Sequence, residues 1–202
     1  MLLVQNSNYK SDRIYTHMAN KVFGLVGPIA SGKGTVVKIL AEKGYQPYSL
    51  SDRIREEITS RGLEVNRQNL NIVSNDLRQN LGSDILAKRT VELIKKDGLE
   101  LVVVDSIRNP EEVKYIKENL GAKIIGISAP QDRRYEMFKA RGNNSVGIES
   151  SEQFKELDDR ETTGTNSHSQ RVADSLKMAD IVVENDGTIE DLRSKIYQLF
   201  NN

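Results

Sequence analysis

A glycine-rich segment near the start of the chain has residue types and a spacing that suit phosphate binding. The stretch fits G-x-x-x-x-G-K, and its candidate phosphate contacts are Gly27, Ala30, Ser31, Gly32, Lys33, Gly34 and Thr35. Glycines let backbone N–H groups converge on an anion, and a following helix directs its positive dipole end at the same point. Lys33 would reach the outer phosphates and neutralise charge during transfer, so it is predicted to be catalytic.

Charged residues at two later points of the chain suit a second ligand. Asp105 ends a run of apolar β-branched residues, where a carboxylate can order the shell of a Mg²⁺ ion or polarise an acceptor. Asp52 and Arg55 are three residues apart, so in a helix both face one cleft. Arginine suits phosphate because its planar fork makes paired hydrogen bonds. The simpler alternatives are a helix-capping acid for Asp105 and ordinary surface ion pairing for Arg55.

Short apolar runs alternate with segments of helical periodicity along the chain. The apolar runs predict strands at 22–26, 45–50, 101–104, 123–128 and 181–184. Periodicity, capping residues and terminal glycines predict helices at 35–43, 51–61, 66–81, 83–96, 110–121, 131–141, 150–159 and 188–199. This alternation predicts an α/β fold with a mostly parallel sheet of about five strands and helices on both faces.

The order of these elements places the candidate residues at one edge of the sheet. In parallel α/β sheets, ligands bind at the carboxyl ends of the strands. The phosphate-binding segment follows the strand at 22–26 and opens a helix, which is the context that its motif requires. We expect one domain over residues 21–202. Residues 1–20 show no sustained periodicity and are expected to form a loosely ordered extension.

The G-K-G-T ending at residues 32–35 resembles that of adenylate kinase and its nucleoside monophosphate kinase relatives. Gly34 stands where many phosphate loops have the Ser or Thr that contacts Mg²⁺, and Thr35 follows one place later. In these kinases the metal is held mainly through nucleotide oxygens and water, so Thr35 is expected to contact phosphate. The resemblance implies a P-loop kinase fold that binds ATP and Mg²⁺, with acceptor-binding helices over about 51–97.

The same resemblance implies acceptor roles for four residues. Asp52 and Arg55 are similar to the D-x-x-R segment in which such kinases grip the acceptor phosphate. The segment 105–112 resembles the D-x-x-R-x-x-x-E stretch of deoxynucleoside monophosphate kinases and of dephospho-CoA kinase-like proteins. It implies acceptor binding by Asp105 and Arg108, a catalytic role for Arg108, and contact of Asp105 with the metal through water.

A basic stretch in the second half of the chain resembles the lid of these kinases, over about 140–170. Such lids carry arginines over the phosphates and exclude water. The resemblance implies that Arg134 contacts the nucleotide and that Arg141 and Arg160 are catalytic, with a solvated helix charge as the alternative for each. Asp186 and Gly187 match the place where such kinases wrap backbone around adenine, or else they form a plain turn.

Composition narrows the function classes. The 202 residues carry 29 Lys+Arg and 29 Asp+Glu, and this balance argues against dedicated nucleic-acid binding. The chain has no Cys, which excludes a disulfide framework and a cysteine nucleophile, and its 2 His argue against a multi-histidine zinc site. No run approaches the roughly 18 apolar residues of a membrane span, and the first residues lack a signal-peptide pattern, so we expect a cytoplasmic protein without membrane association.

The leading hypothesis is an ATP-dependent phosphotransferase of the nucleoside or deoxynucleoside monophosphate kinase type, acting on a small nucleotide-like phosphate acceptor. Dephospho-CoA kinase is the first alternative: residues 179–192 resemble its C-terminal end, whereas Gly34 replaces the Ser of that family. The second alternative is a nucleotide-binding regulatory ATPase that has no acceptor. The sequence leaves the acceptor's base and the oligomeric state open.

Overall fold

A parallel sheet forms the centre of the protein, shown by a computed structural model that describes residues 21–142, 148, 150–164 and 170–200. The strands of this part of the chain are β1 (Val22–Val26), β2 (Gln46–Ser49), β3 (Val102–Ile107), β4 (Lys123–Ser128) and β5 (Ile181–Glu184). They pair in the order β2-β3-β1-β4-β5, and every neighbouring pair is parallel. The predicted fold class is confirmed.

The helices follow the predicted order, but one short helix was not predicted and one helix and one strand are longer than predicted. They are α1 (Lys33–Ala41), α2 (Leu50–Ser60), α3 (Arg67–Leu81), α4 (Ile85–Asp97), α5 (Pro110–Leu120), α6 (Gln131–Ala140), α7 (Ser151–Thr163), α8 (Val172–Lys177) and α9 (Ile189–Gln198). The sequence did not predict α8, which is too short to show a helical period. In addition, α7 continues to Thr163 and β3 continues to Ile107, so Asp105 lies within β3.

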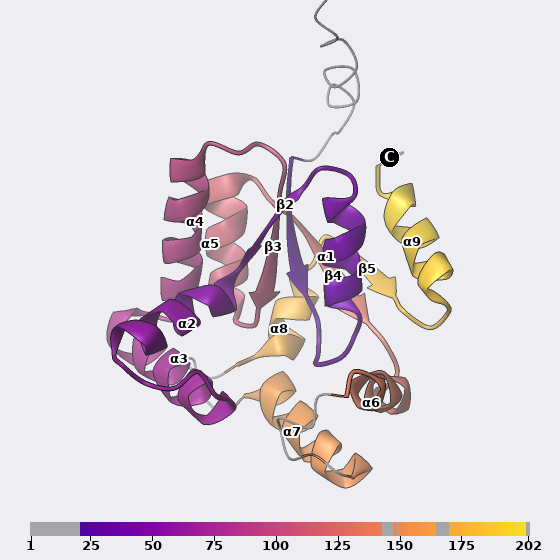
Figure 1. Cartoon of the computed structure of the whole chain (residues 1–202). Helices are drawn as coiled ribbons and strands as arrows, with labels where there is room; N and C mark the ends of the chain where they lie inside the picture. The colour runs from indigo at the N-terminus through magenta and orange to yellow at the C-terminus, as the bar shows by residue number, and fades with distance from the viewer. Residues whose placement is uncertain (1–20, 143–147, 149, 165–169, 201–202) are drawn as a thin grey trace, which may run out of the picture.

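Apolar side chains on the two faces of the sheet hold the helices. One buried cluster joins β1, β3 and β4 to α1 and α9, with Phe23, Val36 and Ile196 among its members. A second cluster joins the opposite face to α2, α3, α4 and α5. Figure 1 shows α1 and α9 on one side of the strands, α4 and α5 on the other, and α2, α3, α6 and α7 beyond the carboxyl ends of the strands. The candidate site therefore lies between the sheet and these last four helices.

No helix of the described residues is both long and apolar enough to cross a membrane.

A buried ion pair connects α3 to the start of α5. The Nε and Nη2 atoms of Arg78 donate to Oε1 of Glu112 at 3.3 and 3.0 Å, and both side chains are buried. The other oxygen, Oε2, accepts the backbone N–H groups of Arg108 at 2.8 Å and Asn109 at 3.1 Å. Asn109 is the N-cap and forms a capping box with Glu112, and Pro110 is the first residue of the helix. Glu112 thus fixes both the helix start and the backbone of Arg108.

We expect Glu112→Gln to destabilise the fold by about 3 kcal/mol, because it leaves the buried guanidinium of Arg78 without its counter-charge. Urea unfolding followed by circular dichroism measures the change. Glu111→Gln is the matched control, since Glu111 is the exposed neighbour in the same helical turn, and it should cost less than about 1 kcal/mol. Equal unfolding midpoints for the two variants would contradict the importance of this pair.

Candidate active site

The loop between β1 and α1 has a backbone that requires glycine at two positions. Gly27 and Gly32 have φ of 152° and 105°, values that residues with a side chain rarely adopt. A Cβ on Gly27 would lie 2.2 Å from the carbonyl oxygen of Ile127, and one on Gly32 would lie 2.4 Å from Nδ2 of Asn185. Ala30, between them, also has a positive φ, of 57°. The predicted segment therefore has the strand–loop–helix form that its motif requires, and packing restricts both positions to glycine; we call this segment the phosphate loop.

Two features of the loop suit a bound phosphate. The N-terminus of α1 has no side-chain cap, because its N-cap residue is Gly32. The hydroxyl of Ser31 is buried and has no hydrogen-bond partner among the described residues. An unsatisfied buried polar group costs about 1–3 kcal/mol, which an anionic oxygen would offset. Ser31, Gly32 and the helix N-terminus thus fit a phosphate group.

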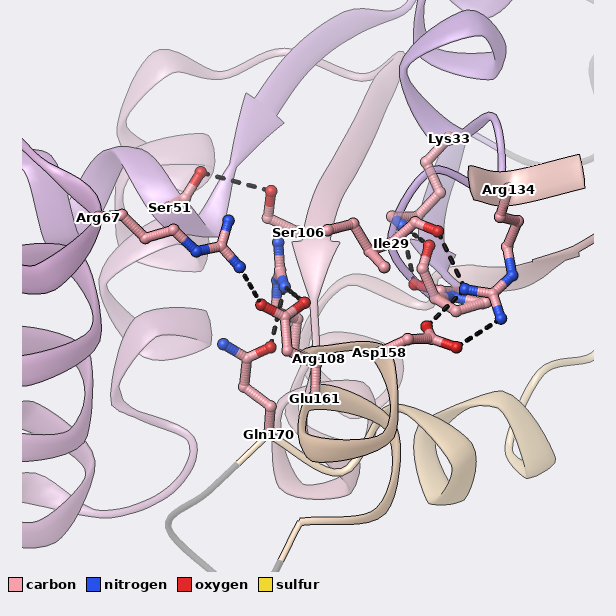
Figure 2. A network of polar contacts seen from close by, with 12 residues as sticks. Ile29, Lys33, Ser51, Arg67, Ser106, Arg108, Arg134, Asp158, Glu161 and Gln170 are labelled. Atoms are coloured by element: carbon pink, nitrogen blue, oxygen red, sulfur yellow. Dashed lines mark hydrogen bonds and ion pairs between the residues drawn. The ribbon is translucent and has the colours of Figure 1, made fainter. Parts of the chain in front are cut away.

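The side chain of Lys33 curls back over the loop. Its Nζ donates to the carbonyl oxygens of Gly27 at 2.8 Å and Pro28 at 2.9 Å (Figure 2). Both acceptors are neutral, so neither hydrogen bond pairs the ammonium group with a negative charge. A phosphate group would be a stronger acceptor for the same N–H groups.

Charges from four other residues act on Lys33. Burial first, then the nearby Arg108 and, more weakly, Arg141 lower the pKa of Lys33, whereas Asp105 and Glu161 oppose the shift; together they bring it to about 8. Three of these four were predicted site residues, and the fold brings them to one place. Glu161 was not predicted, because nothing in its helical context distinguishes it from a solvated surface acid.

Next to the phosphate loop is a cavity of about 190 Å³ whose lining is rich in arginine. It is lined by Arg55, Arg67, Arg78 and Arg108, from α2, α3 and the end of β3. Of the predicted acceptor residues, Arg55 and Arg108 line it, whereas Asp52 and Asp105 do not. We name this cavity the arginine pocket.

Each predicted acceptor arginine is held by neighbouring side chains. Nη1 of Arg55 donates to Ser51 Oγ at 2.9 Å and to Asp52 Oδ1 at 3.1 Å, so Asp52 orients Arg55 from outside the arginine pocket. Nη1 of Arg108 donates to Glu161 Oε2 and to Gln170 Oε1, both at 2.9 Å (Figure 2). Arg55 is therefore held by residues of its own helix, whereas Arg108 is held by residues 53 and 62 positions away in the chain.

Serine hydroxyls from β2, α2 and β3 meet at the wall of the arginine pocket. Ser49 Oγ donates to Ser106 Oγ at 3.0 Å, and the hydroxyls of Ser49 and Ser51 lie 2.9 Å apart. Ser106 has a φ of 65°, which is uncommon for a residue with a side chain and is found mostly where function or packing imposes it. Ser51 and Ser106 line the pocket. No sequence signal marks these serines, because only the pairing of β2 with β3 brings them together.

Asp105 lies near the end of β3, close enough to Lys33 to affect its pKa. Its Oδ1 is buried and has no hydrogen-bond partner among the described residues. No group of three or more His, Cys, Asp or Glu suited to a metal ion is found in the part of the chain that the structure describes. Gly34 occupies the position where many phosphate loops have the Ser or Thr that contacts Mg²⁺. It is exposed, and a Cβ on it would meet nothing within 4 Å. The unpaired carboxylate oxygen of Asp105 fits contact through water with a Mg²⁺ ion that nucleotide oxygens and water mainly hold.

Arg134 differs from its predicted role at the nucleotide. Its guanidinium is buried, where it pairs with Asp158 of α7 at 2.6 Å through Nη2 and also donates to the carbonyl oxygens of Ile29 and Ala129. Figure 2 shows this group between the phosphate loop and α7. With its donors used in this way, Arg134 holds α7 against the loop, and we correct its assignment from nucleotide contact to structural support.

Apolar contacts also hold the lid helices against the phosphate loop. Ala30 is buried in a cluster with Phe138 of α6 and Phe154 of α7, whose rings are 5.3 Å apart. The side chain of Ala30 therefore packs against the lid helices, which leaves only its backbone for a phosphate. This cluster was not predicted, since the segment around α7 is rich in polar residues.

Arg133, the neighbour of Arg134, supports the turn after β5. Its guanidinium donates to the carbonyl oxygens of Asn185, at 3.0 Å, and Gly187. Asp186 pairs with Lys195 of α9 at 2.6 Å and is exposed. Asn185, the first residue of the turn, donates through Nδ2 to the carbonyl oxygen of Ser31 at 3.0 Å. This turn, with Asp186 and Gly187, is thereby linked to the phosphate loop.

The two remaining lid arginines lie in different places. Arg141 is exposed at the end of α6, within electrostatic range of Lys33. Arg160 is on the exposed side of α7 and lines a separate groove between α3 and α7, outside the arginine pocket. Residues 143–147, 149 and 165–169 of the predicted lid are outside the described residues. The catalytic role of Arg141 remains a prediction, and the position of Arg160 does not favour one.

Comparisons with known proteins agree on the fold. A family model of the AAA domain matches residues 24–164. A UPF0200/UPF0201 protein of Archaeoglobus fulgidus is 38% identical over 89% of this chain, and a UPF0200 protein of Methanosarcina acetivorans is 34% identical over 90%. The match spans 54% of the first relative and 95% of the second. Shikimate kinase from Acinetobacter baumannii, solved with shikimate, has a TM-score of 0.55 over 93% of this chain and 97% of its own, at 18% identity.

The pKa of Lys33 predicts how ADP affinity depends on pH. Phosphate oxygens favour the charged ammonium, but in the free protein Lys33 loses its proton above a pH of about 8. Binding above that pH requires proton uptake, so ADP affinity should fall by up to about tenfold per pH unit from about 8 upward. Calorimetric titrations from pH 7 to 9.5, in buffers of different ionisation enthalpy, measure the ADP affinity and the number of protons taken up on binding. Lys33→Met should bind ADP weakly at every pH, and an equal slope in that variant would contradict the assignment.

Proposed function

Because this chain belongs to the AAA domain family and to the UPF0200 proteins and has a P-loop kinase-like fold, we propose that it is an ATP-dependent phosphotransferase. The donor nucleotide would bind at the phosphate loop, and a small anionic acceptor would bind in the arginine pocket. The observation that carries this proposal is the position of Arg108, which lines the arginine pocket and is close enough to Lys33 to lower its pKa. Donor and acceptor sites are therefore adjacent.

Phosphoryl transfer depends mainly on positioning and on stabilising the charge that spreads over the transferred group. Lys33 would bind the outer phosphates of ATP, and Arg108 would contact the transferred group from the acceptor side. Ser31 and the N-terminus of α1 supply further hydrogen-bond donors. When bound, Mg²⁺ neutralises phosphate charge, and Asp105 is the residue that would hold it through water. This arrangement requires no proton-abstracting histidine.

The acceptor would be held by arginine forks and by Ser51 and Ser106. Four arginines in a cavity of about 190 Å³ suit an acceptor that carries a phosphate group, as a nucleoside or deoxynucleoside monophosphate or dephospho-CoA does. A carboxylated hydroxy acid, such as the shikimate of the structural neighbour, has an anionic group of lower charge. A screen for ADP release over these compounds identifies the acceptor. ATP turnover without any phosphorylated product would favour a regulatory ATPase instead.

We expect Lys33→Ala to lower the rate of phosphoryl transfer by about 100-fold or more, because the variant loses a charge that stabilises the transferred group. Coupled ADP release with the best acceptor from the screen measures this rate. Lys38→Ala is the control, since Lys38 is an exposed lysine of the same helix, and it should retain activity. A folded Lys33→Ala variant with normal turnover would refute the donor site.

We expect Arg55→Gln to raise the acceptor KM about tenfold and to leave the KM for ATP unchanged, because Arg55 lines the arginine pocket and is half-exposed. Steady-state kinetics with each substrate varied in turn separates the two constants. Arg61→Gln is the control: Arg61 pairs with Glu57 and Asp76 outside the pocket. A rise confined to the KM for ATP would place the acceptor elsewhere.

A further inference from the structure

The carboxylate of Glu161 occupies a place in the arginine pocket where an anionic group of a ligand would bind. Oε1 accepts from Nη2 of Arg67 at 2.6 Å, and Oε2 accepts from Nη1 of Arg108 at 2.9 Å. Glu161 is 7% exposed and lines the pocket. Figure 2 shows the carboxylate between the two guanidinium groups, with the side chain rising from α7. One carboxylate thus bridges arginines of α3 and of the segment after β3, as a phosphate or carboxylate ligand would.

A second observation shows that this pocket has donors left over. Nη1 of Arg78 is buried without a hydrogen-bond partner among the described residues, although Nε and Nη2 are paired with Glu112. Arg78 is 1% exposed and lines the pocket. An unsatisfied donor of a buried charged group is costly, and an anionic oxygen in the pocket would satisfy it. The pocket therefore has a buried donor that neither Glu112 nor Glu161 satisfies.

Glu161 and an incoming anion would require the same N–H groups. Arg67 and Arg108 carry two positive charges, and Glu161 offsets one of them. A phosphate dianion that bound beside Glu161 would meet a repelling carboxylate within reach of the same donors, whereas one that replaced it would match both charges. The two anions therefore compete, and a dianion has an advantage over a monoanion in displacing the carboxylate.

The position of Glu161 on α7 limits what its displacement would disturb. Asp158 lies one helical turn earlier and pairs with Arg134, beside the phosphate loop. Phe154 anchors the same helix in the apolar cluster with Ala30. Displacement of Glu161 would therefore release α7 from the acceptor side only, and the donor side would stay in place.

We propose that Glu161 is a specificity-determining residue of the arginine pocket: a tethered carboxylate that holds Arg67 and Arg108 until the phosphate of an acceptor replaces it. This inference rests on the proposed function, because it assumes that the acceptor binds in this pocket. Glu161 thereby disfavours weakly charged compounds.

The test is a calorimetric titration of inorganic phosphate into the full chain saturated with Mg²⁺ and ADP, so that the phosphate loop is filled. Glu161→Gln keeps the shape of the side chain and removes its charge, and it should bind phosphate about tenfold more tightly than the wild type. For acetate, a monoanion, the same substitution should increase the binding affinity by a larger factor than it does for phosphate. Glu156→Gln is the matched control, because Glu156 is an exposed acid of α7 outside the arginine pocket, and it should bind as the wild type does.

Two further variants complete the test. Arg108→Gln in the Glu161→Gln background should abolish the gain, which locates the bound phosphate in the arginine pocket. Glu161→Asp, whose shorter side chain cannot bridge both arginines, should give an intermediate gain and serves if Glu161→Gln fails to fold. Unchanged or weaker phosphate binding in folded Glu161 variants would overturn the proposal. Since the titration requires no turnover, failure of ADP binding or of transfer would count against the proposed function separately.

Discussion

The concentration of positive charge beside the phosphate loop is the constraint on which the rest of the site depends. Like charges this close repel one another, so the protein must supply carboxylates of its own to fold without a ligand. Glu161 bridges Arg67 and Arg108, and Asp158 neutralises Arg134. Nζ of Lys33 donates to the carbonyl oxygens of Gly27 and Pro28, and burial beside Arg108 lowers its pKa.

The carboxylates that meet this requirement also determine the architecture around the site. Asp158 and Glu161 are on one face of α7, so a single helix closes both the donor side and the acceptor side. On the acceptor side, Glu112 pairs with Arg78 and accepts the backbone N–H of Arg108. The stability of α3 and α5 and the position of a site arginine are consequently linked through one buried side chain. A ligand anion would substitute for some of these internal contacts, which is how binding can be coupled to the position of α7.

The phosphate loop shows a different relation between sequence and site. Its residues are contiguous; glycines occupy two of its three positive-φ positions, and a helix N-terminus without a side-chain cap follows. The sequence alone therefore predicted the strand–loop–helix unit, the parallel α/β fold and the capping of α5 by Asn109. These features depend on periodicity and on interactions between residues close in sequence, which a single sequence displays directly.

The arginine pocket was decided by tertiary structure. Arg67 and Glu161 are 94 positions apart and Arg108 and Glu161 are 53 apart, and no local pattern pairs them. Arg134, Arg160 and Glu161 all resemble solvated helix charges in the sequence, yet the first is buried against Asp158, the second is exposed and the third lines the pocket. The rotation of each helix about its axis and its packing against the sheet determine whether a given charged side chain is buried, exposed or in the pocket. The sequence therefore determined which residues were available for the site, and the packing of α3 and α7 against the sheet determined which of them form it.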